Sequence, residues 1–422
     1  MKSKIFYGWY LVALTLFLQS VGVGTTLYMY SVIAGAIGQD MPSARSVLML
    51  GSTGMLVVGA LLSPLLGRML DRYPMKWIVV SGATALGVGF ILLALSNHIW
   101  QVVVCYMLFM SAGLTALGSV PASTLLARWF VRYRGLAIGI SALGTQFGGF
   151  AYTPLLAKVI EVQDWRIAVT LMGVAILVTV PLAAYLWVVD YPADKGVAAD
   201  GDAVVPETAT APKTSAEVGA NTAPAMHPDE GVPFYKLMKK RNFIILFVFA
   251  GTLGGIVNNA VIANLALFAT DIGESVTRGA FLVSLLAFIG LFTSPLTGWL
   301  GDRVDIKYVA VALCLFMMTA ALLYAIAVSY EVLVVATVFQ GMAGGGFFPL
   351  WALLVARLYP LNVYGQVMGT TAVGAFGGAA IGPVFAGWLY DLTDSYRVVF
   401  LIFLGTLLVI TFLVTRLRIP LR

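Results

Sequence analysis

Twelve long apolar segments constrain the fold of this chain more than any other feature of its sequence. Each is long enough to cross a bilayer as a helix, which takes about 20 mostly apolar residues. Charged residues are scarce, at 10% of the 422 residues, whereas a soluble domain has about 25%. The alternating, strand-sized segments of a membrane barrel do not occur in the sequence. The chain is therefore predicted to be an all-α membrane protein.

The apolar segments form two sets of six. Helices are predicted over 7–37, 46–70, 77–96, 99–127, 135–159 and 165–189, and over 242–270, 278–300, 307–328, 331–357, 365–390 and 396–416. Residues 190–240 between the sets are rich in Ala, Pro and Thr with few aromatic residues, so they bury too little apolar surface to fold. We expect an N-terminal half over 1–189, a disordered cytoplasmic linker over 190–240 and a C-terminal half over 241–422.

The distribution of Lys and Arg predicts the orientation, because basic residues are retained on the cytoplasmic side of a membrane. With the N-terminus inside, twenty of the 25 basic residues are cytoplasmic. The other five are Arg45, Lys158, Arg166, Arg278 and Arg397. The prediction is a multi-pass protein of the plasma membrane or the bacterial inner membrane, with both termini in the cytoplasm.

A charged decapeptide occurs twice, each time after the second apolar segment of a half. GRMLDRYPMK begins at Gly67 and GWLGDRVDIK begins at Gly298, an offset of 298 − 67 = 231 residues. The similarity extends to the stretches after Ala127 and Ala356 and to DWR at 164–166 and SYR at 395–397. Two halves of like orientation are parallel repeats, as in secondary transporters, where the substrate site lies between the repeats near the midplane.

The duplicated charges suggest a gate at the cytoplasmic mouth. Asp71 with Arg134, or Asp302 with Arg357, would form charge-assisted bonds between helix ends that must break before the mouth opens. The alternative is that these charges only set the topology, although topology alone would not fix their spacing. The expected gate residues are Gly67, Asp71, Arg72, Lys76, Arg134, Gly298, Asp302, Arg303, Lys307 and Arg357.

The predicted membrane interior is polar in places but uncharged. An ionisable side chain deep in the bilayer would mark a functional site, and we expect none there. Amides in hydrocarbon face protein or a water-filled cavity, so they either line a substrate cavity or bridge helices, and both options remain open. The candidate substrate-binding residues are Tyr28, Tyr30, Gln146, Asn258, Asn259, Ser294 and Gln340, with Asn258 and Asn259 at a locally broken helix.

Glycines in the fifth and eleventh segments are spaced for close approach of helices. They are Gly135, Gly139, Gly144, Gly148, Gly369, Gly374, Gly377 and Gly378. They serve either packing within the bundle or dimerisation, and we expect the protein to function as a monomer.

The duplicated G-x-x-x-D-R-x-x-x-K motif resembles that of the major facilitator superfamily, over nearly the whole chain outside the linker. YGW at 7–9 and RWFVRYRGLAIGISALGTQFGG from Arg128 resemble the monocarboxylate and oxalate–formate branch. The resemblance implies the twelve-helix, two-repeat major facilitator fold and a secondary transporter of a small organic solute, with a monocarboxylate as the expected class. Members of that branch usually carry an Arg in the eighth helix with an Asp one turn before it. Gly290 and Ser294 occupy these positions here.

Other classes of function are less consistent with the sequence. An exporter of neutral or amphipathic compounds is the alternative that an uncharged interior favours. The chain has no H-E-x-x-H, G-x-S-x-G or phosphate-binding loop, so neither an enzyme nor a bound cofactor is expected. Cys105 and Cys314 lie inside apolar runs, which predicts no metal cluster, and cytoplasmic loops account for the net charge of +6 without a nucleic-acid partner. The expected partners are the lipid bilayer and a small-molecule substrate, with or without a co-transported proton.

Overall fold

Long helices make up most of the computed structural model, which describes residues 6–41, 45–201, 232–274 and 276–419. Backbone polar groups in hydrocarbon must be satisfied within their own segment, and a helix does this. The N-terminal half contains α1 (Tyr7–Val23), η1 (Gly24–Tyr28), α2 (Tyr30–Asp40), α3 (Arg45–Arg72), α4 (Met75–Ala94), α5 (Ile99–Cys105), η2 (Tyr106–Met110), α6 (Ser111–Leu117), α7 (Ser119–Trp129), α8 (Arg134–Val162) and α9 (Trp165–Trp187). The C-terminal half contains α11 (Arg241–Phe249), η5 (Ala250–Val257), α12 (Asn258–Asp271), α13 (Val276–Arg303), α14 (Ile306–Ile326), α15 (Tyr330–Leu358), η6 (Leu361–Val363), α16 (Tyr364–Thr393) and α17 (Tyr396–Thr415).

Consecutive short elements join into continuous runs, so the described residues form twelve crossings, six in each half. The ends of these runs differ from the predicted ends by at most four residues. Eleven of the runs are long and apolar enough to span a membrane by composition alone. The twelfth is the 29-residue α8, whose hydrophobicity is lowered by its Gly, Ser, Thr and Gln residues. It packs between α1 and α13. The predicted fold class is confirmed.

Three crossings widen from α-helix to π-helix along their length, at η1, η2 and η5. The 231-residue offset carries η1 onto 255–259 (24 + 231 and 28 + 231), so η1 and η5 lie at related places in the first crossing of each half. Such insertions are frequent at functional sites. The helix is therefore widened over Ala250–Val257 and continuous through Asn258, whereas we had expected it to be broken there. The side-chain amide of Asn259 donates to the carbonyls of Gly254 (2.9 Å) and Gly255 (3.0 Å), which satisfies the carbonyls of the widened turn.

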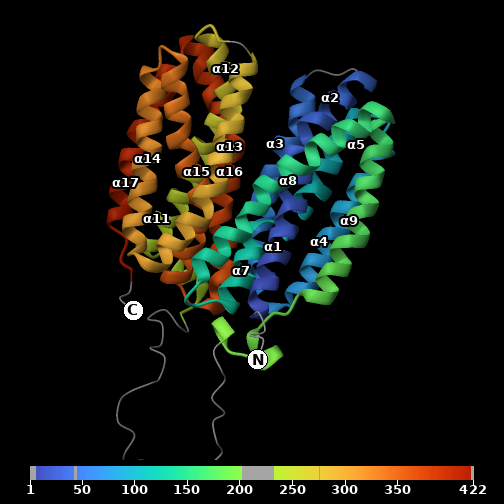
Figure 1. Ribbon diagram of the computed structural model, residues 1–422, viewed down its shortest axis with the longest axis vertical. Helices are drawn as coiled ribbons and strands as arrows, with labels where there is room; N and C mark the ends of the chain where they lie inside the picture. The colour runs from blue at the N-terminus through green and yellow to red at the C-terminus, as the bar shows by residue number, and fades with distance from the viewer. Residues whose placement is uncertain (1–5, 42–44, 202–231, 275, 420–422) are drawn as a thin grey trace, which may run out of the picture.

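The two halves lie side by side, and α1 begins at the same end of the bundle at which α17 ends (Figure 1). The loops after α3 and α13, which carry the duplicated decapeptide, lie at this end too, and we call it the motif end. The halves meet at the motif end and diverge towards the opposite end (Figure 1). The main contacts between them join α3 to α16 and α8 to α13.

Part of the predicted linker is folded. Residues 190–201 form two short 3₁₀ helices, η3 (Pro192–Lys195) and η4 (Ala199–Gly201), and α10 (Phe234–Leu237) precedes α11. Asp190 accepts the backbone N–H of Met75 at 2.9 Å and lies 3.6 Å from Arg128. Asp200 accepts two backbone N–H groups of the loop before α8, at 3.0 and 2.7 Å. The prediction of disorder over all of 190–240 is therefore wrong for this part, because hydrogen-bonded carboxylates and a few buried apolar side chains, such as those of Pro192 and Leu237, hold it against the bundle. Residues 202–231 lie outside the described residues.

Candidate functional site

The two halves approach closely at the glycines that begin the duplicated decapeptide. A Cβ added to Gly67 would lie 2.2 Å from the carbonyl oxygen of Gly365, and one added to Gly298 would lie 2.0 Å from that of Gly135. Side-chain carbons do not occupy such distances, so any larger residue would push the halves apart. The glycine of the motif is thus required by the packing of one half against the other.

One turn beyond each glycine, an aspartate caps a helix of the opposite half. Asp71 accepts the backbone N–H groups of Gly365 (2.9 Å) and Gln366 (2.8 Å) at the start of α16. Asp302 accepts the backbone N–H groups of Gly135 (2.8 Å) and Leu136 (3.0 Å) in the first turn of α8. Residues four apart share one face of a helix, and the free N–H groups at a helix start attract anions. The motif spacing therefore places a close contact and a charge on the same interface.

The partners of these carboxylates differ from the expected ones. We expected Asp71 to face Arg134, but backbone N–H groups surround it and Arg128 is the charge beside it. Arg134 and Arg357 both lie near Asp302. The guanidinium of the buried Arg134 also donates to two carbonyls of its own half, those of residues 130 and 127. Each aspartate thus caps a helix of the other half. The position of a residue in the sequence cannot show which helix it will meet.

The other charged residues of the motif interact within their own half. The ammonium group of Lys76 lies 3.7 Å from the centre of the Tyr185 ring, and the guanidinium of Arg303 lies 4.4 Å from that of Trp299. Lys307 bonds Asp305 through its backbone N–H, and Arg72 is exposed at the end of α3. These contacts suit anchoring at a helix end, because none of them joins the two halves.

Two pairs of uncharged polar side chains lie near the middle of their crossings. The hydroxyl group of Tyr28 donates to the side-chain carbonyl of Gln146 (3.0 Å), and the amide of Gln340 donates to that of Asn258 (3.1 Å). Tyr28 is 39% exposed, so the first pair is the more open of the two. Gln340 is buried, and Asn258 is the more exposed member of the second pair.

Glycines of α13 and α15 bring the two pairs together. A Cβ on Gly345 would lie 2.5 Å from the Cα of Gly290, so the two helices touch there. A Cβ on Gly290 would lie 3.8 Å from the amide nitrogen of Gln146, and one on Gly344 would lie 2.5 Å from the side-chain oxygen of Asn258. The two pairs therefore flank the same stretch of α15, where the halves face each other. We call Tyr28, Gln146, Asn258 and Gln340 the central site.

Three of the predicted substrate residues lie elsewhere. Tyr30 is buried inside the N-terminal half, with its ring 4.7 Å from that of Tyr106. Asn259 bonds carbonyls of its own helix. The hydroxyl group of Ser294 donates across the halves to the carbonyl of Gly139 (3.0 Å), among the close contacts that extend from the motif end. The sequence showed their polarity but not the direction in which each side chain points.

A buried polar chain between α1 and α8 was not predicted. The amide of Gln19 donates to the hydroxyl of Ser141 (2.7 Å), which donates to that of Thr15 (2.8 Å). Within the described part of the chain, the side-chain carbonyl of Gln19 is buried without a hydrogen-bond partner. Thr15 and Gln19 are one helical turn apart, and this spacing of polar residues is the sequence signal that could have predicted the chain. Such residues commonly bridge helices in membranes.

The glycines of α8 and α16 pack inside the bundle. Gly139 contacts Pro295, Gly144 contacts Leu16, and Gly369 contacts Ser63. Gly148 and Gly378 each contact the first crossing of their own half, whereas nothing lies within 4 Å of a Cβ on Gly377. Of the two interpretations of these glycines, packing within the bundle is the one that the contacts support.

Comparison with known protein sequences gives related transporters. The sequence profile of the Major Facilitator Superfamily matches residues 12–330 and 247–421. Monocarboxylate transporter 2 of Mus musculus is 23% identical over 350 residues, which cover 80% of this chain and 69% of that protein. Monocarboxylate transporter 13 of Bos taurus is 24% identical over 400 residues, covering 94% and 86%. Multidrug export protein EmrB of Haemophilus influenzae is 29% identical over 136 residues, covering 32% and 26%.

Comparison with solved structures shows the same fold. The proton:xylose symporter XylE has a TM-score of 0.74 at 11% identity, with 97% of this chain and 95% of that chain covered. The human organic anion transporter MFSD10 has a TM-score of 0.69 at 15% identity, covering 97% and 99%. A bacterial homologue of ferroportin in an outward-facing state has a TM-score of 0.69 at 13% identity, covering 98% and 99%.

Proposed function

Because this chain belongs to the major facilitator superfamily and is a transporter rather than an enzyme, we propose that it moves a small organic acid across the membrane by alternating access. The monocarboxylate transporters among its relatives support this class of solute. The central site lies between two repeats that meet at one end, which is where a rocking transporter binds its substrate. The motif end faces the cytoplasm in this proposal, so the described conformation is open to the outside.

The uncharged central site carries the proposal about how the acid crosses. Its four side chains offer amides and a phenol, and the family's acidic and basic positions in α13 are occupied by Gly290 and Ser294. Desolvating an anion with no basic partner costs several kcal/mol. The acid therefore binds with its own proton attached, and no protein carboxylate needs to titrate at the middle of the membrane.

The two motif aspartates provide the gate in this cycle. Asp71 and Asp302 hold the starts of α16 and α8 while the motif end is closed. Opening that end exposes both carboxylates and both helix starts to water, which replaces the lost hydrogen bonds. The free-energy difference between the two conformations is then small enough for a bound solute to shift it.

Export of neutral or amphipathic compounds is the second candidate. The match to EmrB over 136 residues favours it, as does the lack of charge in the central site. Such compounds need hydrogen bonds and apolar surface but no counter-ion.

Uptake by purified protein in proteoliposomes distinguishes these functions. We expect uptake of lactate to rise as the pH falls, above the leak into protein-free vesicles, because the protonated fraction of the acid rises. Uptake should survive Asp305→Asn and Glu161→Gln, which remove helix-end carboxylates outside the gate. A pH-independent flux of a permanently charged sulfonate would contradict transport of the neutral acid. A flux of neutral amphipaths without any flux of acids would establish the exporter.

A further inference from the structure

At the end opposite the motif end, each half carries the same charged residues at repeat-related positions. Helix α2 ends at Asp40 and α12 ends at Asp271 (40 + 231 = 271). Helix α9 begins with Trp165 and Arg166, and α17 begins with Tyr396 and Arg397 (166 + 231 = 397). The two halves therefore show how one set of charges behaves in two surroundings.

In the N-terminal half these charges form a direct ion pair. The carboxylate of Asp40 accepts hydrogen bonds from the guanidinium of Arg166 and from the indole N–H of Trp165 (3.3 Å). Arg166 also donates to the carbonyl of Ser96 (3.2 Å). The hydrogen bond from Arg166 holds the pKa of Asp40 below its usual range. The pair ties the end of α2 to the start of α9.

In the C-terminal half the corresponding charges are apart. Arg397 donates through Nε to the carbonyl of Ala325 (2.9 Å), much as Arg166 donates to the carbonyl of Ser96. Asp271 interacts instead with the hydroxyl group of Tyr390. The structure describes both the Arg397 and the Asp271 side chains, and it contains no ion pair between them.

Two sequence differences between the halves explain the separation. Tyr390 lies in α16, which starts 230 residues after α8 (364 − 134), so it corresponds to Ile160 (390 − 230 = 160), and only the C-terminal half has a hydroxyl group there to attract the carboxylate. Tyr396 replaces the indole of Trp165 and directs its hydroxyl to Asn264 at 3.2 Å. The aspartate is therefore held towards α16, away from the arginine.

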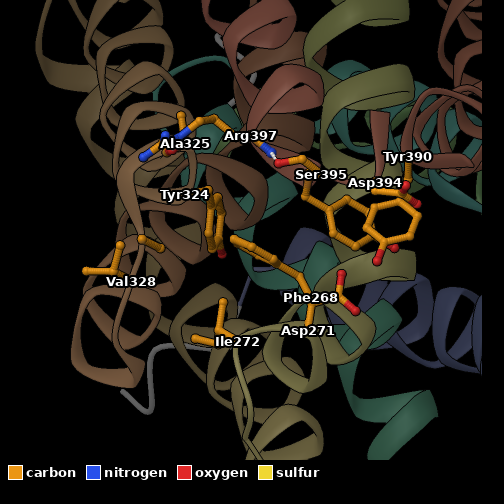
Figure 2. A pocket seen from close by; sticks show the side chains of 12 residues that line it. Phe268, Asp271, Ile272, Tyr324, Ala325, Val328, Tyr390, Asp394, Ser395 and Arg397 are labelled. Atoms are coloured by element: carbon orange, nitrogen blue, oxygen red, sulfur yellow. Dashed lines mark hydrogen bonds between the residues drawn. The ribbon is translucent and has the colours of Figure 1, made fainter. Parts of the chain in front are cut away.

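A cavity of about 390 Å³ lies between the separated charges, in the range of pockets that hold small ligands. Figure 2 shows Arg397 beside Ala325 on one side of the cavity and Asp271, with Tyr390 and Asp394, on the other. Phe268 contributes aromatic surface between the two sides. The cavity thus has a basic wall, an acidic wall and an apolar floor.

We propose that this cavity binds a small zwitterion, with its carboxylate on Arg397 and its ammonium group on Asp271. The guanidinium group binds a carboxylate through two parallel hydrogen bonds, and a carboxylate beside aromatic rings favours an ammonium group. Such a ligand completes in the C-terminal half the bridge that Asp40 and Arg166 make directly in the N-terminal half. It ties the end of α12 to the start of α17, at a place separate from the central site.

Isothermal titration of the purified full-length protein tests the proposal. The probes are glycine, β-alanine and γ-aminobutyrate, whose two charges are increasingly far apart, with propylamine and propionate as single-charge probes. We expect one of the zwitterions to bind at least about tenfold more tightly than either single-charge probe, since each lost charged contact weakens binding by about that factor. Arg397→Gln and Asp271→Asn should each weaken this binding at least about tenfold.

The chain supplies matched controls at the related positions. Arg166→Gln and Asp40→Asn remove the same two charges from the N-terminal half and should leave the affinity unchanged, as should Gln146→Ala at the central site. Val328 lines the cavity and is exposed, so Val328→Trp should block binding with both charges intact, even if a charge variant fails to fold. Binding lost in Asp271→Asn but unchanged in Arg397→Gln would show a plain ammonium site and overturn the proposal. Equal affinity for propylamine, or no binding by any zwitterion, would overturn it too.

Discussion

At the scale of single residues, Tyr28 and Tyr30 offer a matched pair of positions. Both carry a phenol, but Tyr28 bonds Gln146 and is half-exposed, whereas Tyr30 is buried against Tyr106. We expect Tyr28→Phe to raise the KM for the solute about three- to tenfold, because it removes one hydrogen bond at the central site. Tyr30→Phe should leave KM unchanged. Transport assays in proteoliposomes measure both, and equal effects would contradict the assignment of Tyr28 to the site.

Asn258 and Asn259 are a second pair, adjacent in sequence but different in role. Asn259→Leu leaves two carbonyls of the widened turn without their amide partner, which costs about 1–3 kcal/mol of stability for a buried group. Asn258→Leu removes the partner of Gln340 at the central site. We expect the first variant to lower the thermal unfolding temperature by more than the second, and the second to weaken solute binding by more than the first. A reversed order would place Asn259 in the site.

At the scale of elements, the proposed gate consists of two contacts, in each of which a carboxylate of one half caps a helix start of the other half. Asp71→Asn and Asp302→Asn together remove the charge from both caps, so the closed motif end loses stability. We expect the ratio of closed to open conformations to fall about tenfold or more, since a hydrogen bond to a charged group contributes about 1.5–3 kcal/mol.

Distances between spin labels on α2 and α12, at the end opposite the gate, measure that shift. Asp305→Asn is the control, because Asp305 caps the start of α14 within its own half and should leave the distances unchanged. If the double variant kept the distance distribution of the unmodified protein, the caps would not form a gate.

At the scale of the whole molecule, the proposed orientation places the motif end in the cytoplasm. In a background without Cys105 and Cys314, Asn97→Cys lies in an exposed loop at the opposite end. We expect an impermeant thiol reagent to label Asn97→Cys in intact cells and to label Ser215→Cys, in the linker, only after permeabilisation. The reverse pattern would invert the topology and make the described conformation open to the cytoplasm.

The sequence by itself predicted the twelve crossings, the two repeats and the uncharged middle of the membrane. These features are local, because apolar length and residue type along one segment decide whether it enters a bilayer. The 231-residue offset likewise needs only the chain. This offset matches Gly67 with Gly298 and Asp71 with Asp302, so the spacing of Gly and Asp is the same in both halves.

Only the tertiary structure decided which groups meet. Gly365 lies 298 residues from Gly67 (365 − 67), and its backbone is the partner of Asp71 because α3 packs on α16 of the other half. The direction of each polar side chain also depends on packing, so Gln146 reaches the central site while Ser294 faces the closed contact. The same physical reason separates Asp271 from Arg397. The hydroxyl group of Tyr390, on α16, interacts with the carboxylate of Asp271 and holds it away from Arg397. The repeat alone would have predicted a second ion pair.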